Sequence, residues 1–543
     1  MDNAELYFDS EQLMISNFIL YAYMDDGLIG TSLDKKTLLI YERKNDHSLN
    51  YQLRNQYIFP IEIYNVFLFD IGCKNKSFFV NFKSEDHFIN KILIENEIIH
   101  LDKTTSAPFM VLDTQNRSSL VMQNNLNSYV LRIKYDRKFS PEKNLPTRMI
   151  FDVEGFLSEV NSDEVKIEKY SVKLKQIIPE HTSGYFLDDE DQAKLVLQTI
   201  SNKKTYLSLY KKQSNEFYLV QENILPEKIG PFLFGDFFKN GFTSVAFLSE
   251  EDSSFYLNVF KNHGKNDYFK FESKFNKRIK LNEYLQYKTP NLTKNGSKVV
   301  DIFNDSFLHI VILLESGSNT ELLLLKNDGL GNFYPSFGYF DGLRFAHLNS
   351  FSFNDLDFSG KEGLVLNYFE DGKQKLVYKK NNIHGNFYFS VVTFEENGLF
   401  PLPGISYKYI RMEDNEFRIS NQLVQTSFPN LEHPHVFFGL GGAPFLVELT
   451  KVLVADFKTS GSHTFRVYQK IIPNSRISLK SNKYGLKMTL ILNPDAKIKS
   501  IFFFFVVVLI INLVLLSVVH FLEKRKRMHD EKRSDNFVST IGL

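Results

Sequence analysis

The sequence predicts an all-β fold that consists of a seven-bladed β-propeller, a small β-sandwich and one C-terminal transmembrane α-helix. Short apolar runs separated by clusters of Asn, Asp, Gly and Lys continue to about residue 395, without long helical periodicity. Loops headed by aspartate recur at intervals of roughly 40 to 75 residues, which is the length of a four-stranded propeller blade with insertions. We therefore assign the propeller to residues 12–395.

The clearest of these loops lies at residues 353–366, which read FNDLDFSGKEGLVL. Asp355, Asp357 and Ser359 place oxygen side chains at alternate positions, and Gly360 follows. Alternate residues of such a loop point towards one hard cation, and glycine permits the sharp turn. A helix-loop-helix site would need glutamate at position 12, where Leu and Val stand, so we expect a strand after the loop. The three oxygen-bearing residues are the candidate calcium ligands.

The loop recurs in altered form along the chain. Residues 234–248 read FGDFFKNGFTSVAFL, and residues 300–314 read VDIFNDSFLHIVILL. Seven loop heads predict seven blades: Asp25, Asp70, Asp113, Asp188, Asp236, Asp301 and Asp355. Asp152 is a candidate eighth head, so the blade count between residues 135 and 180 stays open.

Composition narrows the class of function. Acidic and basic residues balance at 64 each, so no overall charge favours nucleic acid as a partner. The single cysteine, Cys73, excludes an internal disulfide framework. The sequence contains no H-E-x-x-H, G-x-S-x-G or Walker motif. We expect no enzymatic activity, and no cofactor besides calcium at the candidate loop.

A second β domain follows the loop series. Residues 401–404, PLPG, mark a boundary. Strand-like runs then resume at residues 435–453, 465–468 and 488–492. We interpret residues 396–495 as a small β-sandwich packed on the propeller.

The strongest single signal is the apolar run at residues 501–522, which contains no acid, lysine or arginine. At about 1.5 Å per residue, this run matches the ~30 Å hydrocarbon core, so we predict a transmembrane helix over residues 500–522. Four basic residues follow at 524–527, whereas the other flank has only Lys497 and Lys499.

The positive-inside rule therefore predicts a short basic cytoplasmic tail at residues 523–543, with the β domains extracellular or lumenal. No ordinary signal peptide is evident in residues 1–17. An upstream start, an unusual N-terminus and a tail-anchored protein that faces the cytosol stay open as explanations.

The aspartate loops resemble the FG-GAP repeats of integrin alpha chains, whose pattern is D-x-D-x-D-G-x-x-D followed by apolar residues. The order of parts resembles the T-cell immunomodulatory protein (linkin) family: an FG-GAP propeller, a small β domain, one membrane helix and a short charged tail. Three local matches support this resemblance: FGLG at 438–441, IIPNS at 471–475, and the LNP-to-helix junction that begins at 492–494.

The resemblance implies a single-pass, type I surface glycoprotein that acts in cell adhesion or protein recognition. The ninth-position aspartate of the FG-GAP pattern is replaced by Gly363, Ser244 and His309 in the three clearest loops. Most loops are therefore expected to bind no calcium, and to be held by aspartate side chains that accept hydrogen bonds from turn amides. Candidate N-glycosylation sites begin at Asn75, Asn116, Asn291, Asn295 and Asn304.

Two other classes of function stay open beside membrane-anchored recognition of an unknown protein. One is a lumenal assembly or folding factor. The other is a hydrolase that uses the propeller as a scaffold. A compact group of acids with perturbed pKa values would favour the hydrolase, whereas exposed aromatic side chains on a loop face would favour binding.

Overall fold

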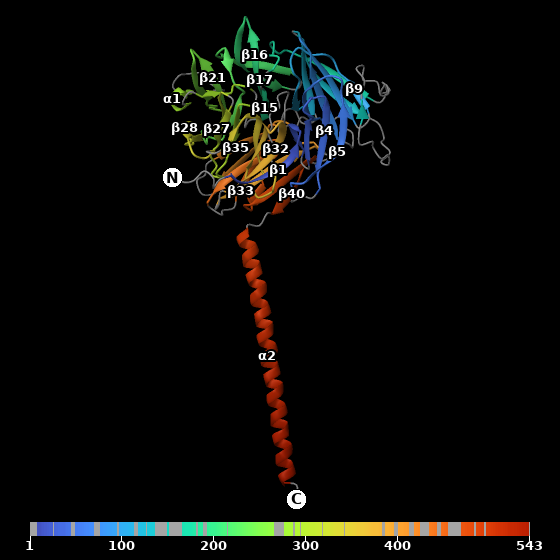
Figure 1. Ribbon diagram of the computed structural model, residues 1–543, viewed down its shortest axis with the longest axis vertical. Coiled ribbons are helices and arrows are strands. Elements are labelled where there is room, and N and C mark those ends of the chain that lie inside the picture. The colour runs from blue at the N-terminus through green and yellow to red at the C-terminus, as the bar shows by residue number, and fades with distance from the viewer. Residues whose placement is uncertain are drawn as a thin grey trace. The chain divides into compact units, whose positions relative to one another are not determined.

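The computed structural model describes residues 8–541, apart from a set of internal segments. The undescribed segments are 25–26, 45–48, 70–75, 95–96, 113–117, 126, 136–148, 151–164, 181–182, 188–192, 214–215, 265–275, 286–287, 294, 318, 341–342, 383–385, 396–399, 412–416, 424–433, 443–446, 454–467, 483–484 and 493–495. The chain divides into two compact units, residues 1–491 and residues 492–543. Figure 1 shows strands in the first unit and the long helix α2 in the second.

The described part of the first unit contains seven successive sheets, whose strands pair antiparallel with their neighbours apart from one short parallel strand in the first sheet. The first sheet contains β2 (Ile19–Met24), β3 (Gly27–Thr31), β4 (Thr37–Arg43) and β5 (Tyr51–Ile58), with β13 (Met149–Ile150) parallel to β5. The second contains β6 (Ile63–Leu68), β7 (Ser77–Lys83), β8 (Phe88–Ile94) and β9 (Glu97–His100). The third contains β10 (Phe109–Leu112), β11 (Ser118–Asn124), β12 (Asn127–Tyr135) and β14 (Val165–Val172). The fourth contains β15 (Ser183–Leu187), β16 (Ala193–Ser201), β17 (Lys204–Gln213) and β18 (Glu216–Ile224).

The next three sheets complete the series. The fifth contains β19 (Lys228–Ile229), β20 (Leu233–Gly235), β21 (Ser244–Glu251), β22 (Ser254–Phe260) and β23 (Asn276–Lys280), and the short α1 (Asn282–Leu285) follows it. The sixth contains β24 (Thr289–Pro290), β25 (Ser297–Val300), β26 (His309–Ser316), β27 (Asn319–Asn327), β28 (Phe333–Ser336) and β29 (Arg344–Phe345). The seventh contains β30 (His347–Asn354), β31 (Gly363–Glu370), β32 (Lys373–Asn381) and β1 (Phe8–Ser16).

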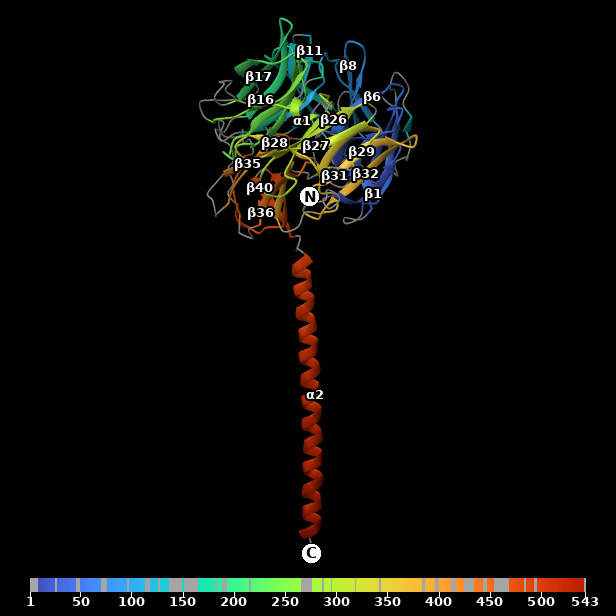
Figure 2. The same cartoon turned by 60° about the vertical axis from the view of Figure 1, so that its left-hand side comes forward.

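The N-terminal strand β1 completes the last sheet of the series and not the first. It pairs antiparallel with β32, with Gln12 opposite Tyr378, and both views show the blue β1 beside β32 (Figures 1 and 2). The pairing covers the edge of β32, which would otherwise present unpaired backbone groups.

Hydrophobic clusters join these sheets in ring order. Each cluster draws buried side chains from two successive sheets, and one cluster joins Val365 of the seventh sheet to Leu28 of the first. The cluster of the third and fourth sheets also includes buried side chains from later strands, such as Phe389. Inner strands such as β16 and β26 are apolar and buried along most of their length because both of their faces are covered. The predicted all-β class with one C-terminal apolar helix is confirmed. The count of seven blades stays a prediction, which this ring order supports.

Two further sheets form the second β domain. One contains β33 (Phe387–Phe394), β36 (Val436–Gly441), β39 (Ser475–Asn482) and β40 (Gly485–Leu492), and the other contains β34 (Ile405–Arg411), β35 (Phe417–Gln422), β37 (Val447–Leu453) and β38 (Tyr468–Ile471). Because β33 pairs with β36 and β39, these contacts favour a boundary before Phe387, earlier than residue 396. The domain limits as a whole stay a prediction.

The second unit is the helix α2 (Ala496–Ile541). The chain has no Pro or Gly between residues 496 and 541, so nothing in this segment breaks the helix. Residues 503–531 form the candidate membrane span, with a mean hydropathy of 2.8 over its most apolar window and no buried side chains there. The helix continues past the predicted span through the basic tail.

Candidate functional site

Three of the predicted aspartate loops lie in the described part of the chain, and they occupy equivalent positions in three successive sheets. Asp236 follows β20, Asp301 follows β25 and Asp355 follows β30. A strand begins after each loop, as predicted for the loop headed by Asp355. The heads Asp25, Asp70, Asp113 and Asp188, together with Asp152, lie outside the described residues.

Each aspartate holds its own loop through backbone amides four or five residues ahead. Asp236 accepts hydrogen bonds from the N–H groups of Asn240 and Gly241, at 3.0 and 2.9 Å. Asp301 accepts from Asp305 and Ser306 at 3.0 and 2.9 Å. These bonds are the aspartate-to-amide contacts that the sequence predicted for loops without calcium.

The Asp355 loop has the same form, with one amide bond from Gly360 at 2.9 Å. The sixth residue of all three loops has positive φ: 74° at Gly241, 69° at Ser306 and 83° at Gly360. Glycine adopts this left-handed conformation without a Cβ penalty, which explains two of the three residues. Ser306 is the exception, because a non-glycine residue is uncommon at this φ.

A cation from the second β domain occupies the position beside Asp355. The Nη2 atom of Arg476, in β39, lies 2.8 Å from Asp355 Oδ2, and both side chains are largely buried. The same guanidinium stacks on the Phe358 ring, 3.9 Å from the ring centroid. Burial raises the pKa of Asp355 to about 6, although Arg476 opposes that rise.

A second side-chain cation, from Lys380, contacts the next candidate ligand. Lys380 Nζ lies 2.9 Å from Asp357 Oδ2, and the Tyr378 hydroxyl donates to Oδ1 at 3.0 Å. Burial acts against ionisation of Asp357, but hydrogen bonding to Lys380 is among the effects that hold the pKa of this carboxyl below its usual value. The Ser359 hydroxyl donates to Asp355 Oδ1 at 3.4 Å. Calcium would have to displace Arg476 and Lys380, so the candidate calcium loop stays a prediction that this geometry does not favour.

The Asp301 loop is bonded directly to the backbone of β36. Gly439 N donates to Asp301 Oδ2 at 3.1 Å, and Ser306 Oγ donates to Gly439 O at 2.7 Å. Gly441 N donates to Asn304 O at 2.7 Å. A Cβ added at Gly439 would lie 2.2 Å from Asp301 Oδ2, so only glycine fits this contact. The FGLG motif of the sequence is therefore the segment of β36 that binds this loop.

The Asp236 loop contacts β35. The Asn421 side chain donates to Thr243 Oγ1 at 2.6 Å, and the backbone N–H of Ile419 donates to Asp236. Burial raises the pKa of Asp236 to about 6, and the amide bonds and the positive charge of Arg418 oppose it. The three aspartate loops thus bind three strands of the second β domain: β35, β36 and β39.

Asp301, Asp305 and His309 form the one group of candidate metal ligands found among the described residues, and their ligand atoms lie within 4.8 Å of one another. His309 is fully buried. Its Nδ1 accepts the Asn327 backbone N–H at 3.1 Å, which assigns the ring proton to Nε2. Nε2 lies 3.8 Å from Asp305 Oδ1 and has no hydrogen-bond partner.

This arrangement fits a metal poorly, because a metal-bound histidine normally donates its other ring N–H and here that nitrogen is an acceptor. Burial lowers the pKa of His309 to about 3, so the ring stays neutral. Burial also raises the pKa of Asp301, and the neighbouring Asp305 raises it further. One feature of the sequence pointed to this group, the histidine at the ninth loop position, whereas the loop pattern contained no signal for Arg476.

The predicted glycosylation sites differ in exposure. Asn75 and Asn116 lie outside the described residues, and Asn291 and Asn295 lie at half-buried loop positions. Asn304 is 3% exposed, and its side chain donates to Gly360 O at 3.0 Å. A glycan on Asn304 is incompatible with this packing, so Asn291 and Asn295 are the described sites that suit one.

Comparison with known proteins gives one family match. Residues 400–485 match the family model for the ITFG1 C2 domain. ITFG1 is the T-cell immunomodulatory protein (linkin), so this part of the chain matches the family that the sequence predicted. No curated protein matches the chain. The crystal structure of BBS1N in complex with ARL6DN, soaked with lead, is similar over 70% of this chain and 99% of that one, with 9% identity and a TM-score of 0.32.

Proposed function

We propose that this chain, whose residues 400–485 match the linkin-family C2 domain, is a single-pass membrane protein whose β domains recognise another protein, as in cell adhesion. The observation that carries the membrane part is the apolar surface of α2. Phe503, Phe504 and Phe505 are 67 to 70% exposed, and the whole candidate span contains no buried side chain. Such a surface is stable in lipid and costly in water.

Exposed aromatic side chains support the recognition part. Leu330, Tyr334 and Phe337 are 67%, 58% and 58% exposed, and they lie within eight residues on and beside β28. Aromatic residues are enriched at protein interfaces, and exposed apolar side chains that gather in one patch of a surface mark such sites. We propose residues 330–337 as the recognition segment.

The buried acids do not favour a hydrolase over a protein-recognition function. Asp236 and Asp301 line a cavity of about 20 Å³ at the contact with β35 and β36, and Asp301 also lines a second cavity of about 100 Å³. The first volume holds about one water molecule, and the second is well below the roughly 300–1,000 Å³ of a typical ligand pocket. Their oxygens are also engaged by loop and domain amides.

The test is an aggregation assay with cells that carry the full-length chain. Cells with the wild-type chain should aggregate with untransfected cells more than mock cells do. The double variant Tyr334→Ser/Phe337→Ser should lower this gain several-fold, because it removes apolar contact area. Leu53→Ser is the matched control, since Leu53 is 40% exposed on a different sheet. Equal aggregation with and without the wild-type chain would refute a role in adhesion.

A further inference from the structure

Asn512 is a polar residue at the centre of the apolar helix. It lies eleven residues after Ile501 and ten before Leu522, the ends of the uncharged run. At about 1.5 Å per residue, each end is roughly 15 Å away, so this side chain would lie near the bilayer midplane. This placement rests on the membrane span proposed above.

The Asn512 carboxamide is only partly satisfied by its own helix. Its one hydrogen bond within the described residues runs from Nδ2 to the Val508 carbonyl, at 3.0 Å. A carboxamide offers two N–H donors and one oxygen acceptor, so one N–H and the oxygen remain. The side chains three and four positions away can take neither: they are Val508, Leu509, Leu515 and Leu516.

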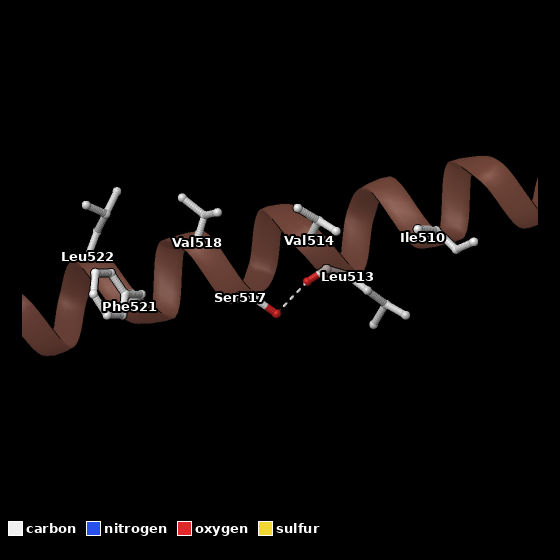
Figure 3. A pocket seen from close by; sticks show the side chains of 7 residues that line it. All are labelled: Ile510, Leu513, Val514, Ser517, Val518, Phe521 and Leu522. Atoms are coloured by element: carbon white, nitrogen blue, oxygen red, sulfur yellow. Dashed lines mark hydrogen bonds between the residues drawn. The ribbon is translucent and has the colours of Figure 1, made fainter.

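Ser517 is the hydroxyl-bearing residue of the same run, and its hydrogen bonding differs from that of Asn512. Figure 3 shows its hydroxyl pointing along the helix to the Leu513 carbonyl, and that hydrogen bond is 2.8 Å long. The surrounding side chains on that face, such as Val514, Val518 and Phe521, are apolar. A serine hydroxyl has a single donor, which this bond uses. Ser517 therefore needs no partner from outside the helix, whereas Asn512 does.

We propose that two copies of this chain associate in the membrane through reciprocal hydrogen bonds between their Asn512 side chains. A carboxamide is complementary to itself, because the free N–H of one copy meets the free oxygen of the other. A two-fold symmetric contact then satisfies both groups with one residue type. Hydrogen bonds between amide side chains are a known source of helix association in lipid, where water cannot replace them.

Resonance energy transfer between two populations of the full-length chain tests the proposal, with a donor or an acceptor fluorophore fused after Leu543. Wild-type chains in one membrane should show transfer that rises with surface density and persists at low density. Asn512→Val should weaken self-association about three- to tenfold, which corresponds to the ~0.6–1.4 kcal/mol of such bonds in membranes. Asn512→Gln should retain it, because the carboxamide remains, and Ser517→Val is the matched control that should leave it unchanged.

Carbonate extraction of the same membranes separates the two levels of failure. If the wild-type chain is released, the membrane span and this inference fall together. If the chain stays embedded and Asn512→Val associates as strongly as the wild type, only the inference is wrong. Transfer at the level of a non-interacting membrane protein, with Asn512-dependent crosslinking to a different polypeptide, would overturn it in favour of a heteromeric partner.

Discussion

At the scale of single residues, the aspartate loops show how a calcium-type pattern becomes a contact between domains. The pattern of Asp355, Asp357 and Ser359 supplies oxygens for a cation, and in this fold the cations are Arg476 and Lys380. Arg476 belongs to a strand 121 residues away, and a guanidinium fits a carboxylate through directed N–H groups. The loop ligands could be predicted from local spacing, but their partners could not, because tertiary packing alone brings them there.

The first prediction concerns the variant Arg476→Met. It should lower the free energy of unfolding of the detergent-solubilised full-length chain by about 3 kcal/mol, because it leaves the Asp355 carboxylate buried without its partner. Chemical denaturation followed by the circular dichroism of the β domains measures the change. Asp355→Asn combined with Arg476→Met should recover part of the loss, since neither charge then remains.

Calcium gives the same loop a second readout. Millimolar calcium should not stabilise the wild-type chain, whereas the double variant Arg476→Met/Lys380→Met should gain calcium-dependent stability, because two oxygen ligands lose their internal cations. Calcium-dependent stabilisation of the wild type that disappears in Asp355→Asn would show that calcium displaces Arg476 after all.

At the scale of elements, the loops after β20, β25 and β30 hold the second β domain through β35, β36 and β39. The strands themselves could be predicted from apolar runs such as VAFL in β21 and IVILL in β26. Three pairings could not be predicted from the sequence: β1 with β32, β33 with β36, and β33 with β39. Each joins strands that lie far apart in the sequence, so it is a property of the whole arrangement rather than of any local segment.

The second prediction concerns Gly439→Ala in β36. The new Cβ would lie 2.2 Å from Asp301 Oδ2 and from the Asn304 carbonyl carbon, so loop and strand must separate. We expect a loss of about 1–3 kcal/mol, as for other overpacked sites. Gly442→Ala is the matched control, because the nearest atom to its Cβ would be 3.9 Å away.

Limited proteolysis adds a local readout for this pair of variants. Gly439→Ala should expose the contact between the Asp301 loop and β36 to cleavage, and Gly442→Ala should keep the wild-type pattern. Equal stability and equal cleavage of both variants would mean that the Asp301 loop does not hold β36.

At the scale of the whole molecule, the two compact units differ in where their apolar side chains lie. The first unit buries its apolar strands between sheets, whereas α2 exposes its apolar surface along the candidate span. The sequence predicted this division well, because an uncharged run of this length and an alternation of strands and loops are both local signals. Orientation in the membrane depends on flanking charge, for which the sequence offers residues 524–527 against Lys497 and Lys499.

The third prediction is that the C-terminal tail is cytoplasmic. In sealed microsomes that contain the full-length chain with a tag after Leu543, added protease should remove the tag and leave the first unit intact. The protected unit should carry N-linked glycan. Asn291→Gln and Asn295→Gln should reduce the glycosidase-sensitive shift, because those side chains are only partly buried and a glycan can be attached there. Asn304→Gln should leave it unchanged, since Asn304 is buried against Gly360 O.

The opposite orientation in the membrane predicts different results in the same assay. A first unit that is digested in unbroken vesicles and carries no glycan faces the cytosol, and α2 is then a tail anchor. Residues 330–337 could not meet a protein on another cell in that case, so cell adhesion would be refuted while self-association through Asn512 would stand. In that orientation the tail lies on the lumenal side, so the basic residues at 524–527 must cross the bilayer during insertion. Because moving these charges through the hydrocarbon core is costly, we expect the tail to be cytoplasmic.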